Sequence, residues 1–202
     1  MLPNDHLTAF RNKVRRTRRL LSRQVAFHDA GKIPKTELES IFELAFLNAF
    51  VAFENELTEL LKTNLLMPTG SDGLLRSKYV PLNRMDAERL LLGTQRYFQL
   101  LPVEQMEKIS KVYLKDGRPF TTLSTVQKGS IAKSHAIRNH IAHNSPDSKK
   151  TYLKRVRDHV TLSSNRTAVG LYLRSSMTSS LTYFDHHISE LGGIMNHLCS
   201  SS

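Results

Sequence analysis

The sequence predicts an all-α protein, a helical bundle with about four or five core helices and additional helices at the N- and C-terminal ends. Apolar residues recur at helical spacing over most of the chain, Pro and Gly separate these segments, and only residues 168–173 have the composition of a strand. Because the sequence contains no repeat of fixed period and no Gly/Ser-rich or Pro-rich linker, we expect residues 1–202 to form a single domain.

Composition and charge restrict the class of protein. With 40% hydrophobic and 23% charged residues, the chain has the balance of a globular protein rather than of a disordered or fibrous one. Its 29 Lys and Arg residues outnumber its 18 Asp and Glu residues, which gives a formal net charge of +11. This excess of positive charge favours a polyanionic partner, either a nucleic acid or an anionic membrane surface.

Three features of the sequence favour a cytoplasmic protein with no membrane partner. The single cysteine, Cys199, excludes an intramolecular disulfide and a thiolate zinc cluster, as expected in a reducing compartment. The most apolar run, residues 44–53, has only about half of the ~20 residues that a membrane span requires. No apolar block follows the basic residues near the N-terminus, so no secretory signal is predicted.

The first helix is expected over residues 5–27. Apolar residues form one narrow edge, too thin to favour a membrane surface, and seven basic residues form a broad cationic face: Arg11, Lys13, Arg15, Arg16, Arg18, Arg19 and Arg23. Such a face would bind RNA phosphates through salt-dependent contacts. The candidate RNA-binding residues are therefore Arg11, Arg15, Arg16, Arg18, Arg19 and, farther along the chain, Lys133.

The second helix is expected over residues 35–64, directly after Pro34. Its middle is apolar almost all round, which is typical of a helix at the centre of a bundle. Glu54 lies four residues after Phe50 and three before Leu57, hence on the expected buried stripe. Because a buried carboxylate needs a partner, Glu54 is a candidate for an ion pair of either structural or functional importance.

Pro, Gly, Asp and Asn residues delimit the remaining elements. Further helices are expected over residues 86–101, 102–114, 125–142 and 179–198. Between the helices we expect a loop over residues 65–84, a break at 116–119, a turn at 144–146, a basic segment over 149–157 and a short strand at 168–173. Asp86 is expected to cap its helix, and Pro102 to lie in a first helical turn.

The segment RNHIAH, residues 138–143, contains residue types that suit catalysis. Arg138 and His143 are five residues apart, which places them about 140° apart round an ideal helix. Pro146, however, disfavours helical geometry at Ser145, so we expect the last turn to fray or tighten and to bring the imidazole towards Arg138. An arginine and a titratable histidine would then meet at an exposed helix end.

This pair suits cleavage of an RNA phosphodiester bond. The ribose 2′-hydroxyl must lose a proton, the leaving 5′-oxygen must gain one, and negative charge develops on the phosphoryl oxygens. Histidine exchanges protons near neutral pH, and arginine presents a planar charged fork to phosphoryl oxygens. These steps need no metal ion, although one histidine must then serve as base and acid unless a second copy of the chain supplies the other group.

The motif Arg138-x4-His143, with the polar Asn139 directly after the arginine, resembles the R-x4–6-H signature of the HEPN superfamily of ribonucleases and RNA-binding helical bundles. The resemblance covers roughly residues 35–145. The segments GLYLRSS and LTYFDHHISEL in the last third are similar to bacterial HEPN proteins of the Ribo-L-PSP type. The resemblance implies a HEPN-like helical bundle in which Arg138 and His143 are catalytic, Asn139 orients the histidine or the phosphate, and Glu54 holds Arg138.

The resemblance also implies a metal-independent endoribonuclease without a cofactor. Two copies would form a homodimer with their motifs facing one cleft, and cleavage would leave 2′,3′-cyclic phosphate and 5′-hydroxyl ends. Many HEPN proteins act in toxin–antitoxin or antiphage systems, so the expected partners are RNA and an antitoxin or another defence protein. Some members of the superfamily only bind RNA, nucleotides or proteins, and a noncatalytic module of that kind is the alternative.

The same residues also have structural interpretations. Arg138 could be a surface residue and His143 a histidine at a helix end, where the helix macrodipole favours basic groups. His135 and His143 lie eight residues apart on one face, but no Asp, Glu or Cys stands nearby at ligand spacing, so no metal site is expected. We expect a structural role for His140 and a solvent or interface position for His186 and His187.

Overall fold

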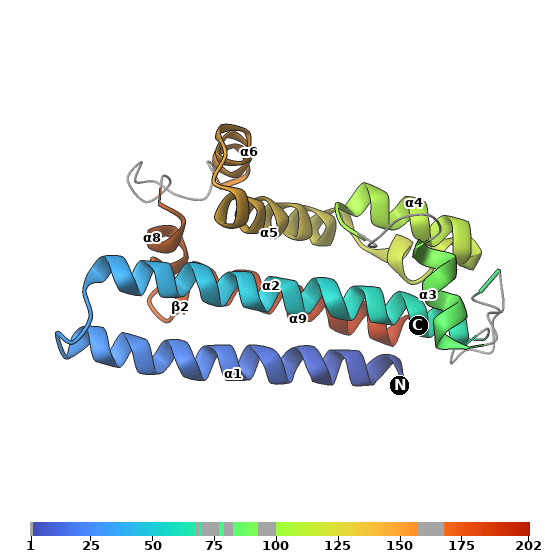
Figure 1. Ribbon diagram of the computed structural model, residues 1–202, viewed down its shortest axis with the longest axis horizontal. Helices are drawn as coiled ribbons and strands as arrows, with labels where there is room; N and C mark the ends of the chain where they lie inside the picture. Colours follow the sequence, from blue (N-terminus) through green and yellow to red (C-terminus); the bar gives the residue numbers. More distant parts are fainter. Residues whose placement is uncertain (1, 68, 70–76, 79–82, 93–99, 157–167) are drawn as a thin grey trace. The chain divides into compact units, whose positions relative to one another are not determined.

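The protein is described from a computed structural model that covers residues 2–67, 69, 77–78, 83–92, 100–156 and 168–202. These residues form eight α-helices, two short 3₁₀ helices and one antiparallel hairpin (Figure 1), so the all-α prediction is confirmed. The α-helices are α1 (Pro3–Asp29), α2 (Lys35–Leu66), α3 (Arg84–Leu92), α4 (Val103–Tyr113), α5 (Thr125–His143), α6 (Pro146–Val156), α8 (Val169–Arg174) and α9 (Tyr183–Ser200). The short elements are η1 (Lys115–Gly117), η2 (Phe120–Thr122), β1 (Ser176–Thr178) and β2 (Leu181–Thr182).

The described residues divide into two compact units. One, the α4 unit, comprises Met1–Phe10, Phe53–Lys128 and Gly192–Ser202, and the other, the α6 unit, comprises Arg11–Ala52 and Gly129–Leu191. Helices α1, α2, α5 and α9 contribute residues to both. The single domain over residues 1–202 stays a prediction. No helix in the described part of the chain is long and apolar enough to cross a membrane.

In the α6 unit, α1, α2 and α9 lie alongside one another (Figure 1). The Phe42 ring of α2 packs edge-on against Phe184 of α9, with centroids 6.0 Å apart. Phe50, about two turns farther along α2, stacks on His135 of α5 with centroids 6.1 Å apart. Phe46, which lies between them in the sequence, is fully buried. This burial agrees with the prediction from the apolar side chains on nearly all sides of this part of α2.

In the α4 unit, the start of α1 packs against the second half of α2. Phe10 meets Phe53 edge to face, with centroids 5.9 Å apart. Side chains of α2, α4, η2 and α9 complete this core, in which the following residues are at most 4% exposed: Leu57, Leu60, Leu61, Leu65, Met106, Leu114, Phe120, Leu123, Met195 and Leu198. After α4 the chain turns at Asp116 and Gly117, whose φ angles are 55° and 70°, at the predicted break.

The predicted bounds of the first two helices are close to those observed. Helix α1 ends at Asp29 because Gly31, with φ 71°, adopts the left-handed conformation. The N–H of Gly31 donates to His28, and the N–H of Lys32 donates to Phe27 over 2.9 Å, which is the hydrogen-bond pattern of a Schellman end. Helix α2 then begins at Lys35, after Pro34, and continues to Leu66, two residues beyond the prediction.

The predicted helix over residues 86–101 differs from α3. Helix α3 begins at Arg84 because the Asn83 side chain, rather than Asp86, caps it by accepting the N–H of Asp86 over 3.1 Å. It ends at Leu92, residues 93–99 lie outside the described residues, and residues 100–101 are not helical. Pro102 is the residue before α4 rather than part of its first turn. Most of the predicted loop over residues 65–84 also lies outside the described residues.

The predicted strand over residues 168–173 is wrong, because this segment forms helix α8. The basic segment over residues 149–157, for which no secondary structure is predicted, belongs to helix α6 as far as Val156. The buried residues of α8 are Val169, Gly170, Tyr172 and Leu173. A short apolar run of this kind can form either a buried strand or a buried helix, so its sequence alone does not distinguish the two. The last helix begins at Tyr183 instead of residue 179 because β2 pairs with β1 before it.

Gly170 lets α8 approach α2 closely. A Cβ atom at this position would lie 2.3 Å from the backbone oxygen of Glu39, and the backbone there cannot move aside as a side chain would.

We therefore expect Gly170→Ala to lower the free energy of unfolding by roughly 1–3 kcal/mol. The matched variant Gly193→Ala, in the exposed interior of α9 with open space around its Cβ, should raise this free energy by up to about 1 kcal/mol. Urea unfolding measures both changes, and equal values would contradict the expected close contact.

Candidate functional site

The residues of the predicted motif lie on α5, in the α6 unit. Arg138 and Asn139 are partly buried, whereas His143, the last residue of the helix, is exposed. Helix α5 itself is held by Ile131 and Ile137, both fully buried, while the predicted apolar position Val126 is 75% exposed. The motif is therefore carried by a helix whose buried face is anchored in a core.

Asn139 orients two neighbouring side chains. Its Oδ1 accepts a hydrogen bond from Nη1 of Arg138 over 3.1 Å, and its Nδ2 donates to Nε2 of His135 over 3.3 Å. The structure thus joins Asn139 to His135, one turn earlier, rather than to His143. The sequence indicates this contact only through the spacing of four residues between His135 and Asn139, which places the two side chains on the same face of the helix.

Arg138 and His143 remain apart. The expected fraying does not occur, because α5 stays α-helical to its last residue and the N–H of Asn144 donates to the carbonyl of His140 over 2.9 Å. The chain leaves the helix only at Asn144, whose φ is 43°. On a regular helix, side chains five residues apart point about 140° away from each other, so Arg138 and His143 lie on different faces of α5. The two side chains therefore offer a cation and an imidazole to a bound molecule at separate positions on the end of α5.

Helix α6 follows the motif after two residues and brings further cations beside it. Ser145 and Ser148 cap α6 reciprocally, since each backbone N–H donates to the other's hydroxyl, over 3.0 and 3.2 Å. Pro146 takes the first helical position, which its fixed φ favours. The Ser-Pro-x-Ser pattern of residues 145–148 is the feature of the sequence that indicates the start of this helix. The exposed basic residues of α6 are Lys149, Lys150, Lys154 and Arg155.

His140 fastens α6 to α5, in agreement with the predicted structural role. It is 6% exposed, its ring stacks on Tyr152 of α6 with centroids 5.2 Å apart, and its Nδ1 lies 3.3 Å from the hydroxyl of Ser148. Burial, with a smaller contribution from the charge of Lys149, lowers the pKa of His140 below its ordinary value. The relative positions of His143 and α6 therefore depend on a neutral, buried imidazole.

The paired histidines of α9 have different surroundings, and the predicted solvent or interface position is wrong for one of them. His187 is fully buried, and a hydrogen bond of 2.8 Å joins its Nε2 to the hydroxyl of Tyr172. His186 is partly exposed and lies 3.4 Å from a carboxylate oxygen of Glu190. Burial raises the pKa of Tyr172 above its ordinary range, so its hydroxyl stays protonated and can keep donating hydrogen bonds.

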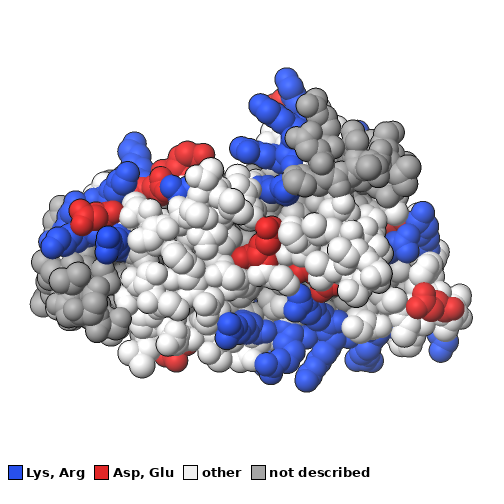
Figure 2. Space-filling view, turned by 180° about the vertical axis from the view of Figure 1, so that it is seen from behind, with Lys and Arg blue, Asp and Glu red and all other residues white. Residues whose placement is uncertain are grey.

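The cationic face of α1 is exposed as predicted. Arg11, Arg15, Arg16 and Arg19 are exposed, and Figure 2 shows Lys and Arg side chains gathered along the edge that α1 forms. Arg18 differs from them: its Nε donates to Oδ1 of Asp185 over 3.0 Å, and Nη2 donates to Ser189 over 3.2 Å. Arg18 therefore helps to hold α1 against α9. Lys133, on α5, is partly buried.

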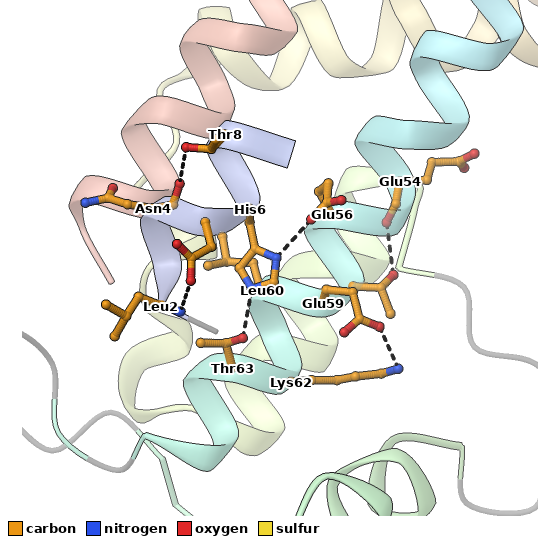
Figure 3. A network of polar contacts seen from close by, with 12 residues as sticks. Leu2, Asn4, His6, Thr8, Glu54, Glu56, Glu59, Leu60, Lys62 and Thr63 are labelled. Carbon is orange, nitrogen blue, oxygen red and sulfur yellow. Dashed lines mark hydrogen bonds and ion pairs between the residues drawn. The ribbon is translucent and has the colours of Figure 1, made fainter. Parts of the chain in front are cut away.

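Glu54 lies in the α4 unit and is partly rather than fully buried. Its backbone oxygen accepts the hydroxyl of Thr58 over 3.0 Å, and its carboxylate points away from His6 and Glu56 (Figure 3). Its pairing with Arg138 stays a prediction.

Within the α6 unit, the carboxylate of α2 with a shifted pKa is Glu43, which accepts the N–H of Gly170 over 2.8 Å. Burial raises the pKa of Glu43, and this hydrogen bond partly opposes the rise.

The fold and the site together define a basic, mainly helical protein with an Arg–Asn–His cluster at one helix and two further cationic helices. Among the described residues, no group of three or more His, Cys, Asp or Glu side chains could hold a metal ion. The chain matches no protein-family model, no curated protein and no solved structure. The arrangement of its own side chains must therefore support any functional assignment.

The lowered pKa of His140 predicts a pH-dependent stability. Below about pH 6.5 the unfolded chain binds a proton at this ring that the folded protein resists, so the free energy of unfolding falls as the pH decreases. We expect His140→Phe, which keeps an aromatic ring against Tyr152, to lose less stability than the wild type between about pH 7.5 and pH 5.5. Urea unfolding at both pH values measures the two losses. Equal losses would show that His140 is not responsible.

Proposed function

We propose that this chain is a HEPN-type endoribonuclease that cleaves RNA with His143 and Arg138. The observation that carries this proposal is the grouping of an exposed imidazole, an oriented guanidinium and the cations of α6 within one stretch of α5 and α6. The all-α fold agrees with a HEPN-like helical bundle. A helix end lined with Lys and Arg suits a ligand that carries one negative charge per nucleotide.

The reaction proceeds by attack of the ribose 2′-oxygen on the adjacent phosphorus. His143 accepts the proton of the 2′-hydroxyl, and the bond between phosphorus and the 5′-oxygen breaks. The leaving 5′-oxygen takes a proton from the His143 of a second copy of the chain, so the products are a 2′,3′-cyclic phosphate and a 5′-hydroxyl. Arg138 stabilises the charge that develops on the phosphoryl oxygens, while Asn139 fixes the guanidinium through its 3.1 Å hydrogen bond. Every step uses side chains of the protein and needs no metal ion or cofactor.

Two copies of the chain would supply the two proton-transfer groups. A single exposed histidine cannot be base and acid in the same step, so a homodimer with two motifs at one cleft suits the reaction better than a monomer. Glu54 is the proposed partner of Arg138. The expected partners are cytoplasmic RNA and an antitoxin or other defence protein that restrains the nuclease in a toxin–antitoxin or antiphage system.

A noncatalytic HEPN module is the second candidate. The separation of Arg138 from His143 favours this candidate, because a binding surface does not require the two groups to act on one phosphate. Such a module would bind RNA or nucleotides, or would dock an acidic protein on the cationic faces of α1 and α6. It would bind RNA in a salt-sensitive manner without cutting it.

Removal of the imidazole separates the two candidates. We expect His143→Ala to slow cleavage of mixed tRNA and mRNA in EDTA at least about 100-fold, since general acid–base catalysis contributes roughly 10²–10⁴. Arg138→Ala should slow it by a similar factor through lost charge stabilisation. Denaturing gels follow the cleavage. The control is His28→Ala, which removes another histidine from the last turn of a helix and should leave the rate unchanged.

The outcomes of this comparison are distinct. Undiminished cleavage by His143→Ala would contradict the catalytic role of this residue. Absence of cleavage by the wild type, with RNA binding intact, would favour the noncatalytic module. An active nuclease should also be toxic when the chain is expressed alone, whereas expression of the other candidate should be tolerated.

The cationic face of α1 predicts the salt dependence of RNA binding. The triple variant Arg11→Gln, Arg15→Gln, Arg19→Gln removes three exposed charges, and the slope of the logarithm of affinity against the logarithm of salt should become less steep by about 2. Fluorescence anisotropy with single-stranded RNA measures this slope. The charge-matched control Lys108→Gln, Lys111→Gln, Lys115→Gln alters exposed residues of α4 and η1 and should leave the slope almost unchanged. Equal slopes for the two variants would exclude α1 as the RNA-binding face.

A further inference from the structure

A second cluster of reactive groups lies in the α4 unit, where the first turns of α1 meet the end of α2. His6 of α1 is fully buried, with Nδ1 2.9 Å from Oε2 of Glu56 and Nε2 2.8 Å from Oγ1 of Thr63 (Figure 3). Glu56 and Thr63 are seven residues apart and therefore lie on one face of α2. The imidazole stands between a carboxylate and a hydroxyl, with one ring nitrogen directed at each.

A neutral His6 ring beside an ionised carboxylate would give the two hydrogen bonds one direction. An ionised carboxylate only accepts, so Nδ1 of His6 carries the proton that is shared with Glu56. In the neutral ring Nε2 is then an acceptor, and the Thr63 hydroxyl donates to it. This is the order of nucleophile, base and orienting carboxylate that activates a hydroxyl for attack on a carbonyl group.

Thr63, at one end of this cluster, borders a cavity. Thr63 is 5% exposed and lines a cavity of about 360 Å³ within the α4 unit, a volume in the range of small-molecule sites. Leu2, Pro3 and Met67 contribute apolar surface to its lining, and Asn4 and Asn64 contribute carboxamides. A polar bridge that only fastened α1 to α2 would not need a cavity beside Thr63, and Phe10 and Phe53 already join these helices in the same unit.

We propose that Thr63, His6 and Glu56 form a second catalytic site, which hydrolyses small carboxylic esters held in this cavity. The site is separate from the proposed ribonuclease residues and does not depend on them. Thr63 is the nucleophile, His6 the base and acid, and Glu56 a positioning residue that keeps the imidazole in the required tautomer. The apolar lining suits a short acyl chain, and the carboxamide of Asn4 is a donor of the kind that stabilises an oxyanion.

The reaction proceeds in two balanced steps. Oγ1 of Thr63 bonds to the carbonyl carbon as its proton moves to Nε2 of His6, and the bond from that carbon to the alkoxy oxygen breaks as the alcohol takes the proton from His6. Water then attacks the acyl-threonine in the same way. Its proton passes through His6 to Oγ1, which leaves with the electrons of the broken bond, and the carboxylic acid is released.

The test combines a covalent probe with ester turnover by the full chain. An alkyl fluorophosphonate should label Thr63 of the wild type with loss of fluoride, as peptide mass spectrometry would show. Hydrolysis of p-nitrophenyl butyrate should fall at least about 100-fold in Thr63→Val and be retained within about tenfold in Thr63→Ser. The matched control Thr58→Val changes the same residue type on the same helix, where its hydroxyl only bonds a backbone oxygen, and should keep both activities.

The role of Glu56 has its own readout. Because Glu56 acts only through the imidazole, Glu56→Gln should lower kcat by about ten- to a thousandfold with little change in KM. A merely structural bridge would instead give a wild type without labelling at Thr63, or a Thr63→Val variant that hydrolyses the ester as fast as Thr58→Val, and either result would overturn the proposal. If Thr63→Val fails to fold, labelling of the wild type and turnover by Thr63→Ser still decide it.

Discussion

Burial of α2 is the constraint on which the other elements depend. Its side chains from Phe42 to Leu61 include aromatic and aliphatic residues on nearly every side, and most of them are fully buried. Removal of this surface from water is the dominant favourable term in folding, so other helices must cover α2 along its length. Helix α9 and helix α5 do so in the α6 unit, and the start of α1 does so in the α4 unit.

The same burial dictates where the polar groups of α2 find partners. A carboxylate on a helix that is enclosed by apolar neighbours needs a hydrogen-bond donor. Two carboxylates of α2 have donors of different kinds, a backbone N–H and an imidazole ring. Glu43 receives the backbone N–H of Gly170, which is available because α8 approaches closely where no Cβ intervenes. Glu56 receives the ring of His6. Both contacts join segments that are far apart in sequence, and both fix a short or terminal helix against α2.

The two candidate sites use histidine in opposite environments. His143 stands at an exposed helix end, where water or a large polyanion can reach it, and the exposed basic residues of α6 follow it in the sequence. His6 is fully enclosed, with each ring nitrogen engaged by one oxygen atom. Exposure suits phosphate chemistry on a long polymer, whereas enclosure suits a small neutral ligand that leaves its hydration water behind. Residue type alone does not distinguish these roles, because the environment of an imidazole determines its protonation and its access to a substrate.

The amino-acid sequence by itself determined the all-α class, the two long N-terminal helices, α5 and the exposed cationic face of α1. These features depend on local periodicity, on Pro and Gly and on charge, all of which act over a few residues. Tertiary structure alone decided that Val169–Arg174 is a helix, because a short apolar run is consistent with a helix or a strand until its neighbours are known. It also directed Asn139 to His135 and kept Arg138 from His143. The His6, Glu56 and Thr63 cluster was equally hidden in the sequence, since its members stand up to 57 residues apart and meet only when α1 packs on α2.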